Sequence, residues 1–202
     1  MSIVVEHEKR RREILEKALD VFMDEGFEDV TFQKIADRCG ITRTTLYIYF
    51  KNKREIFNFS IKQMLLGLES DITKVKKEKN LSHAEKLISV MSVIIERLEE
   101  NRRLLSVVLN YLFHIAKSDF DPDNRVRRRT VRLRHILSTM LIEGIKAGEF
   151  TQSTNVKDLN EMLYGLLEAA VFRLTVLRRS SVEDIKEAIK LAVKNISKNY
   201  GI

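Results

Sequence analysis

The side chains that could do chemistry are concentrated between Thr31 and Arg54, in the run TFQKIADRCGITRTTLYIYFKNKR. They carry hydroxyl, guanidinium, ammonium and phenol groups, which can donate hydrogen bonds to phosphate oxygens and to the edges of bases. Residues 38–54 contain five basic residues and no acidic one. This composition favours an anionic partner such as nucleic acid.

The same run predicts two short helices joined by a tight turn. Thr31 and Thr42 can each cap a helix by accepting a backbone N–H, and Gly40 permits the left-handed conformation that ends the first helix. Leu46 and Phe50 are four residues apart and are expected to face inward, so the polar residues between them face outward. This order of helix, glycine turn and short helix is typical of a helix-turn-helix, which reads the major groove of DNA.

The run from Gly40 to Lys53, GITRTTLYIYFKNK, resembles the signature of the tetracycline-repressor (TetR) family of bacterial transcription regulators. Four upstream positions extend the match over roughly the first 60 residues: Phe27, Thr31, Ile35 and Ala36. The resemblance implies a homodimer that places two reading helices about one DNA turn apart on a near-palindromic operator. It also implies a small-molecule effector, bound by the C-terminal helices, that releases the DNA.

The motif match also implies a role for each residue of the interface. Arg43, Thr44 and Gln33 are expected to approach base edges, and Arg43 can bond guanine bidentately. Ile48 replaces the polar or aromatic residue more usual between the two tyrosines, so an apolar contact such as a thymine methyl group is expected there. The residues expected to hold phosphates are Thr42, Thr45, Tyr47, Tyr49 and Lys53. Thr31 and Lys51 complete the predicted interface.

The composition predicts an all-α globular protein. One proline, seven glycines and 44% hydrophobic residues in 202 residues favour helices over β structure or disorder. The net charge is +7, yet residues 1–57 contain eleven basic and eleven acidic residues. The basic residues of 38–54 therefore polarise the charge of this segment toward the predicted reading helix.

No convergent set of catalytic groups is visible in the sequence, so no enzymatic activity, cofactor or metal site is expected. Four histidines are scattered, and there is no glycine-rich phosphate loop. A single cysteine, Cys39, excludes an internal disulfide framework and is expected to be a buried residue that closes the helix-turn-helix.

No segment predicts a membrane span or a signal peptide. The longest stretch without Lys, Arg, Asp or Glu, residues 104–116, has 13 residues and is too short to cross a bilayer. The N-terminus is charged and no apolar region follows it. We therefore expect a cytoplasmic protein with no membrane partner.

Two domains are expected: a helix-turn-helix DNA-binding domain over residues 1–56, with an N-terminal arm, and a helical effector-binding and dimerisation domain over residues 57–202. Residues 1–8 lack periodicity and are expected to be a mobile arm that precedes a helix starting at Lys9. The basic run 9–12 fits a solvated helix end or a DNA contact about equally.

The resemblance places an effector pocket among the middle helices. Its expected lining is apolar and rich in adaptable methionines, which predicts a largely hydrophobic ligand. The lining residues are Met64, Leu68, Met91, Ile95, Leu105, Leu109, Phe113, Leu133, Ile136, Met140 and Leu167. Arg129 projects into the apolar sector of its helix, so its guanidinium needs an anionic partner. That partner is either an internal carboxylate of Glu99, Glu100 or Glu168, or the head group of an amphipathic acid such as a fatty acid or an aromatic carboxylate.

The helix expected over residues 156–178 has two apolar faces. A helix of a small domain has one core to face, so the second face predicts a homodimer, unless the helix lies wholly inside the domain. The predicted interface residues are Gly165, Ala169, Phe172 and Val176, with Ile189 and Val193 from the last helix. The alternative to a sequence-specific regulator is a nonspecific nucleoid-binding or adaptor protein, whose DNA affinity would depend on phosphate contacts alone.

Overall fold

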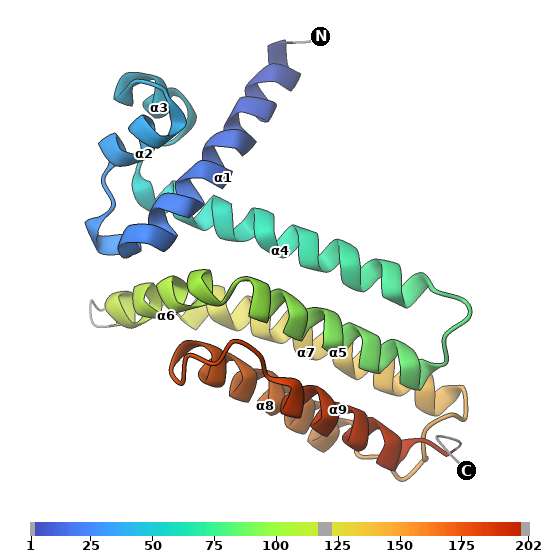
Figure 1. Ribbon diagram of the computed structural model, residues 1–202. Helices are drawn as coiled ribbons and strands as arrows, with labels where there is room; N and C mark the ends of the chain where they lie inside the picture. The colour runs from blue at the N-terminus through green and yellow to red at the C-terminus, as the bar shows by residue number, and fades with distance from the viewer. Residues whose placement is uncertain (1–2, 117–122, 199–202) are drawn as a thin grey trace. The chain divides into compact units, whose positions relative to one another are not determined.

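The computed structural model describes residues 3–116 and 123–198, and within them every side chain except those of residues 3, 4, 63, 64, 115, 116 and 123–130. The all-α prediction is confirmed over these residues, in which one isolated bridge pairs Phe150 with Ser197 (Figure 1). The helices are α1 (Ile3–Asp29), α2 (Phe32–Cys39), α3 (Arg43–Tyr49), α4 (Lys53–Lys77), α5 (His83–Glu100), α6 (Arg102–Ala116), α7 (Asp123–Lys146), α8 (Val156–Thr175) and α9 (Glu183–Ile196). None of them combines the length and the apolarity needed to cross a membrane.

The chain forms two compact units, and α6 contributes to both. Residues up to 67 group with 106–114, and residues 68–105 group with those from 115 onward. The predicted boundary at residue 56 placed all of α6 in the second domain, whereas residues 106–114 of α6 group with the DNA-binding unit. The reason is an aromatic cluster, because the ring of Tyr111 lies 4.4 Å from that of Phe27 and 5.1 Å from that of Phe57. The core of the first unit thus includes a side chain from beyond residue 100.

In the first unit, α1 begins earlier than predicted. Residues 3–8 continue the helix, so the expectation of a mobile arm over these positions is wrong. One face of α1 is apolar and packs into the core of this unit, since its members are all buried: Ile14, Ala18, Val21 and Phe22. Gly26 has φ 80° and ψ 167°, which breaks the helical geometry of α1 near its end.

The second unit has its own core, built by α5, α7, α8 and α9 around side chains such as Leu87, Met91 and Leu163. A capping box begins α5, in which Glu85 N donates to Ser82 Oγ and Ser82 N donates to Glu85 Oε2. Ser82 N and Ser82 Oγ both donate to the Glu85 carboxylate, and these two hydrogen bonds hold the pKa of the Glu85 carboxyl below its ordinary value.

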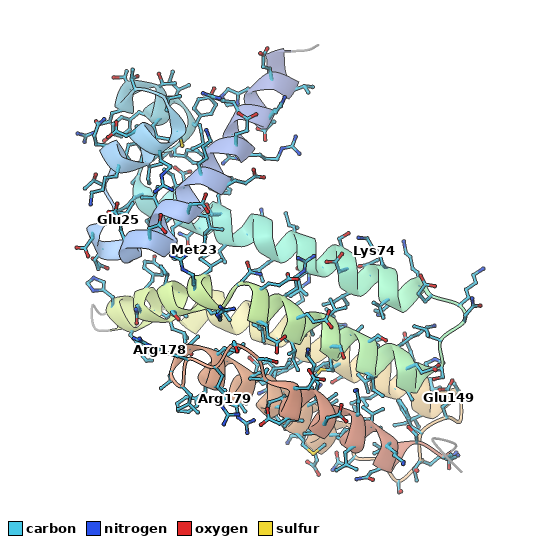
Figure 2. All side chains as sticks on the ribbon, in the orientation of Figure 1. Met23, Glu25, Lys74, Glu149, Arg178 and Arg179 are labelled. Carbon is cyan, nitrogen blue, oxygen red and sulfur yellow. The ribbon has the colours of Figure 1, made fainter. Side chains whose placement is uncertain are left out.

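A second carboxylate, Glu149, fastens the turn after α7 to the start of α5 (Figure 2). Its two oxygens contact His83 N and His83 Nδ1, each at 2.7 Å. Burial acts to raise the pKa of the Glu149 carboxyl, but the hydrogen bonds from His83 outweigh it and hold the pKa below its ordinary value. The turn is therefore tied to a helix that precedes it by more than 60 residues.

Candidate nucleic-acid interface

Both predicted helix caps of the helix-turn-helix are present. Thr31 Oγ1 accepts from Lys34 N at 3.2 Å, and Thr42 Oγ1 accepts from Thr45 N at 3.1 Å. Gly40 adopts φ 67° and ψ 36°, the left-handed conformation that glycine takes without steric cost. Because these contacts are local, the residues of the turn fix the direction in which α3 leaves α2.

The reading helix α3 has one buried and one exposed side. Leu46 and, just after the helix, Phe50 are buried, as predicted. On the other side a continuous sector is exposed, formed by Arg43, Thr44, Tyr47 and Ile48. Ile48 is 69% exposed, more than any other large apolar side chain described. An apolar group left in water on a short helix is consistent with a contact made only when DNA is bound.

The two tyrosines that flank Ile48 are each held by a ring from a neighbouring helix. Tyr47 packs on Phe32 of α2, with ring centroids 4.5 Å apart. Its phenol oxygen also accepts from Arg43 at 3.2 Å. Tyr49 stacks on His7 of α1, with centroids 4.6 Å apart and an interplanar angle of 24°. Both phenols are thus oriented in the absence of a ligand.

Some polar groups of the predicted interface already have partners within the unit. Gln33 Nε2 donates to Asp37 Oδ1 at 2.7 Å, so contact with a base would exchange this bond. Arg38, one of the five basic residues in 38–54, pairs with Asp24 at 3.1 Å. This ion pair places part of the basic segment against the acidic end of α1 rather than toward a ligand.

Lys53 was predicted to hold a phosphate, but in this structure its ammonium is used inside the unit. Lys53 Nζ donates to the carbonyl oxygens of Phe27 at 2.9 Å, Glu28 at 2.7 Å and Val30 at 3.0 Å. An ammonium has three N–H donors, and all three are satisfied here. The cation also suits the end of α1, where unpaired carbonyl groups carry negative partial charge. Lys53 therefore joins the start of α4 to the end of α1.

We expect Lys53→Met to lower the free energy of unfolding by about 1.5–3 kcal/mol, because hydrogen bonds from a charged donor are lost. Urea unfolding followed by circular dichroism measures this loss. Lys51→Met, two residues away on an exposed lysine, is the matched control and should change little. If Lys53→Met leaves stability unchanged but lowers the salt slope of DNA binding by about one unit, Lys53 holds a phosphate instead.

Cys39 has the buried structural position that was predicted. Its thiol lies 4.0 Å from the carbonyl oxygen of Ile14, and burial raises its pKa above the ordinary value although nearby cations act in the other direction. A raised pKa disfavours the reactive thiolate. Among the described residues no group of three or more His, Cys, Asp or Glu side chains is arranged to hold a metal ion.

The residues predicted to line an effector pocket are divided between the two units. Within the second unit, four of them are buried in the common core: Met91, Ile95, Met140 and Leu167. Leu68, Leu133 and Ile136 pack against this core and are partly buried, as is Leu105. Leu109 and Phe113 belong to the α6 segment grouped with the first unit, and Phe113 is exposed. The side chains of Met64 and Arg129 lie outside the described residues.

A small hollow of about 40 Å³ is present in the second unit, but it shares only Met140 with the predicted lining. Its other lining residues are charged or polar: Lys76, His83, Lys86 and Glu143. Two of the carboxylates proposed as partners of Arg129 are already engaged. Glu99 accepts from Val182 N at 2.8 Å and Ser181 Oγ at 3.0 Å, and Glu100 pairs with Arg97.

The second apolar face of α8 is exposed, so α8 is not enclosed by its own domain. Phe172 and Val176 are 53% and 59% exposed, and Gly165 and Ala169 are half-buried beside them. Met162, which the sequence reasoning missed, lies on the same face and is also exposed. Its position three residues before Gly165 could have identified it.

For α9 the predicted interface residues were wrong. Ile189 and Val193 are 2% and 0% exposed and pack in the core of the second unit, so neither is available to a partner. An amphipathic helix buries its apolar stripe against its own domain when a core is present. The exposed apolar residue of α9 is instead Leu191, which lies off this stripe.

Comparison with known proteins agrees with this geometry. Residues 14–58 match the family described as "Bacterial regulatory proteins, tetR family", and residues 60–196 match "YsiA-like protein, C-terminal region". Among curated relatives, the fatty acid metabolism regulator protein of Bacillus subtilis is 28% identical over 163 residues, which cover 79% of this chain and 80% of the relative. The HTH-type transcriptional regulator YfiR of Bacillus subtilis is 28% identical over 96% of each chain.

Solved structures show the same fold. A TetR transcription regulator from Haloarcula marismortui matches with a TM-score of 0.81 at 19% identity, over 95% of this chain and 100% of that chain. The transcriptional regulator FadR from Bacillus subtilis, solved in complex with stearoyl-CoA, matches with a TM-score of 0.70 at 22% identity, over 94% and 99% of the two chains. At 19% and 22% identity, the similarity to these solved structures shows that the fold is shared. With both sequence matches, it leads to one identification: the chain belongs to the tetR family of bacterial regulatory proteins and is a DNA-binding transcriptional regulator.

Proposed function

We propose that this protein is a homodimeric repressor that binds a near-palindromic operator and is released by a long-chain acyl ligand with an anionic head group. The observation that supports DNA binding is the exposed side of α3. This helix is capped by Thr42, and its exposed side lies opposite the side that carries the buried Leu46. A bacterial regulator that binds a DNA operator would act in the cytoplasm.

On the operator, the exposed sector of α3 would enter the major groove. Arg43, Thr44 and Gln33 would contact base edges, and Ile48 would contact a thymine methyl group. The phosphate contacts would come from residues around this sector: Thr31, Thr42, Thr45, Tyr47, Tyr49 and Lys51. Lys53 would contribute by fixing the start of α4 rather than by binding DNA directly.

The dimer would be formed by the exposed face of α8 together with Leu191 of α9. Apart from the adjacent residues and backbone of α8, a Cβ added at Gly165 would meet no atom of the described chain within 4 Å. The space beside Gly165 is therefore open in the single chain and would allow close approach of a second helix. Phe172 would be the apolar anchor of the contact, since aromatic residues contribute strongly to interface cores.

The acyl ligand is inferred from two relatives together with the charge of this chain. One curated relative is a fatty acid metabolism regulator, and one structural relative was solved with stearoyl-CoA. The first half of α7 contains six arginines, at positions 125, 127, 128, 129, 132 and 134. Phosphate and carboxylate groups are the partners that guanidinium groups prefer. An acyl chain would require the core side chains around Met91 to separate, as cryptic pockets do on ligand binding.

The proposed function is tested by selecting bound fragments from random and genomic DNA and measuring their affinity against scrambled duplexes. We expect the selected site to bind at least about a thousandfold more tightly, with a near-palindromic sequence. Adding a long-chain acyl-CoA should lower this affinity, while coenzyme A alone should not. Equal affinity for every duplex would instead indicate the nonspecific nucleoid-binding alternative.

The role of Arg129 in binding the head group gives a separate prediction. We expect a long-chain fatty acid to raise the melting temperature more than the alcohol or amine of equal chain length, because a ligand that binds only the native state stabilises it. Arg129→Leu should abolish the difference between acid and alcohol. Arg132→Leu, on the same helix but paired with Glu69, is the control and should retain it. An acid response that survives Arg129→Leu would remove Arg129 from the ligand site.

A further inference from the structure

The first turns of α1 lie beside the end of the reading helix. His7 stacks on Tyr49 with ring centroids 4.6 Å apart and planes 24° from parallel. One turn further along α1, the guanidinium of Arg11 lies 4.2 Å from the centroid of Phe59 and 5.2 Å from that of Phe50. Two successive turns of α1 therefore pack on the residues that end α3 and continue into α4.

The other basic residues of the same segment do not share the packed position of Arg11. On a helix with 100° per residue, Lys9 and Arg12 point away from the side that carries His7 and Arg11. Both are exposed. Arg10 lies nearer to the packed side, but it pairs with Glu13 at 3.1 Å. Charge alone would select the run 9–12 as the DNA-contacting part of α1, whereas the geometry selects the aromatic stack of His7 on Tyr49.

We propose that His7 is a positioning residue for operator binding, which acts by holding the phenol of Tyr49 in the orientation that contacts a phosphate. The inference rests on the proposed DNA-binding function, in which Tyr49 is a phosphate anchor. An offset aromatic stack is favourable and removes rotational freedom from both rings. A phenol fixed in advance loses less conformational entropy when it meets the phosphate.

The other tyrosine of the reading helix offers an internal comparison. Tyr47 is held by Phe32, a buried residue of α2 that belongs to the helix-turn-helix itself. The ring that holds Tyr49 comes instead from a residue that precedes the motif by more than 20 positions. The N-terminal turn of α1 thus provides an aromatic ring that packs on Tyr49 from outside the motif, whereas Phe32 provides the ring that packs on Tyr47 from inside it.

The test measures operator affinity by fluorescence anisotropy for full-length wild type, His7→Ala, His7→Phe, Tyr49→Ala and the double variant His7→Ala/Tyr49→Ala. We expect His7→Ala to weaken binding by about tenfold for the dimer, on matched and mismatched operators alike, because the stack supports a phosphate contact. His7→Phe keeps the stack without the imidazole nitrogens and should restore wild-type affinity within about twofold. In the Tyr49→Ala background, His7→Ala should have no further effect.

Lys9→Ala is the matched control, since it removes a full charge from the same helix on the opposite side. It should change affinity less than His7→Ala. The inference is overturned if His7→Ala binds like wild type, if its loss adds to that of Tyr49→Ala, or if His7→Phe fails to restore binding. Melting temperatures measured in parallel identify any variant that has unfolded. A wild type without preference for its operator would refute the proposed function, whereas the coupling of His7 to Tyr49 can still be measured on any duplex.

Discussion

Phe172→Asp is expected to convert the dimer into monomers. Phe172 is 53% exposed in the single chain and lies in the centre of the exposed α8 face, between Ala169 and Val176. Placing a carboxylate without a partner in a buried interface costs several kcal/mol, which exceeds what a contact of modest size can offset. Sedimentation velocity measured over a range of concentrations would show the change in mass.

Operator affinity should fall with the dimer, because each monomer would retain a single half-site. The matched control is Leu66→Asp, at an apolar residue that is 54% exposed on α4 and outside the predicted interface. This variant should remain dimeric and bind the operator with unchanged affinity. A wild-type protein that sediments as a monomer, or a Phe172→Asp protein that stays dimeric, would refute the interface.

Arg43→Ala is expected to relax the sequence specificity of binding at one base position. Arg43 opens α3, is exposed, and has only Tyr47 as a hydrogen-bond partner at 3.2 Å among the contacts described. A bidentate bond from arginine to guanine contributes about 1–3 kcal/mol of discrimination, so the variant should lose that amount on the matched operator and nothing on a duplex mismatched there. Titrations against operators changed one base pair at a time measure the difference.

Tyr47→Phe provides the control for Arg43, because it removes the phenol oxygen that Arg43 contacts while leaving the guanidinium in place. It should weaken binding to all sequences by the same factor if Tyr47 holds a phosphate. If Arg43→Ala also loses one uniform factor on every sequence, then Arg43 anchors the backbone and another residue of α3 reads the base.

The features that the sequence determined by itself are those set by neighbours along the chain. The caps at Thr31 and Thr42 and the left-handed turn at Gly40 are formed by contacts within a few residues, and each was predicted correctly. The buried side of α3 also follows from helical periodicity alone. For these reasons the fold class, the helix-turn-helix and its outward-facing residues are predictable from the order of residues along the chain.

Only the tertiary structure decided which contacts form between side chains that are far apart in the sequence. Lys53 caps α1 from more than 20 residues away, and Tyr111 completes an aromatic cluster whose other members come before residue 60. The stripe that contains Ile189 and Val193 shows that one side of α9 is buried, but periodicity does not distinguish the domain's own core from a partner chain. The stack of His7 on Tyr49 leaves no signal in either local sequence, because it depends on where two helices meet in space.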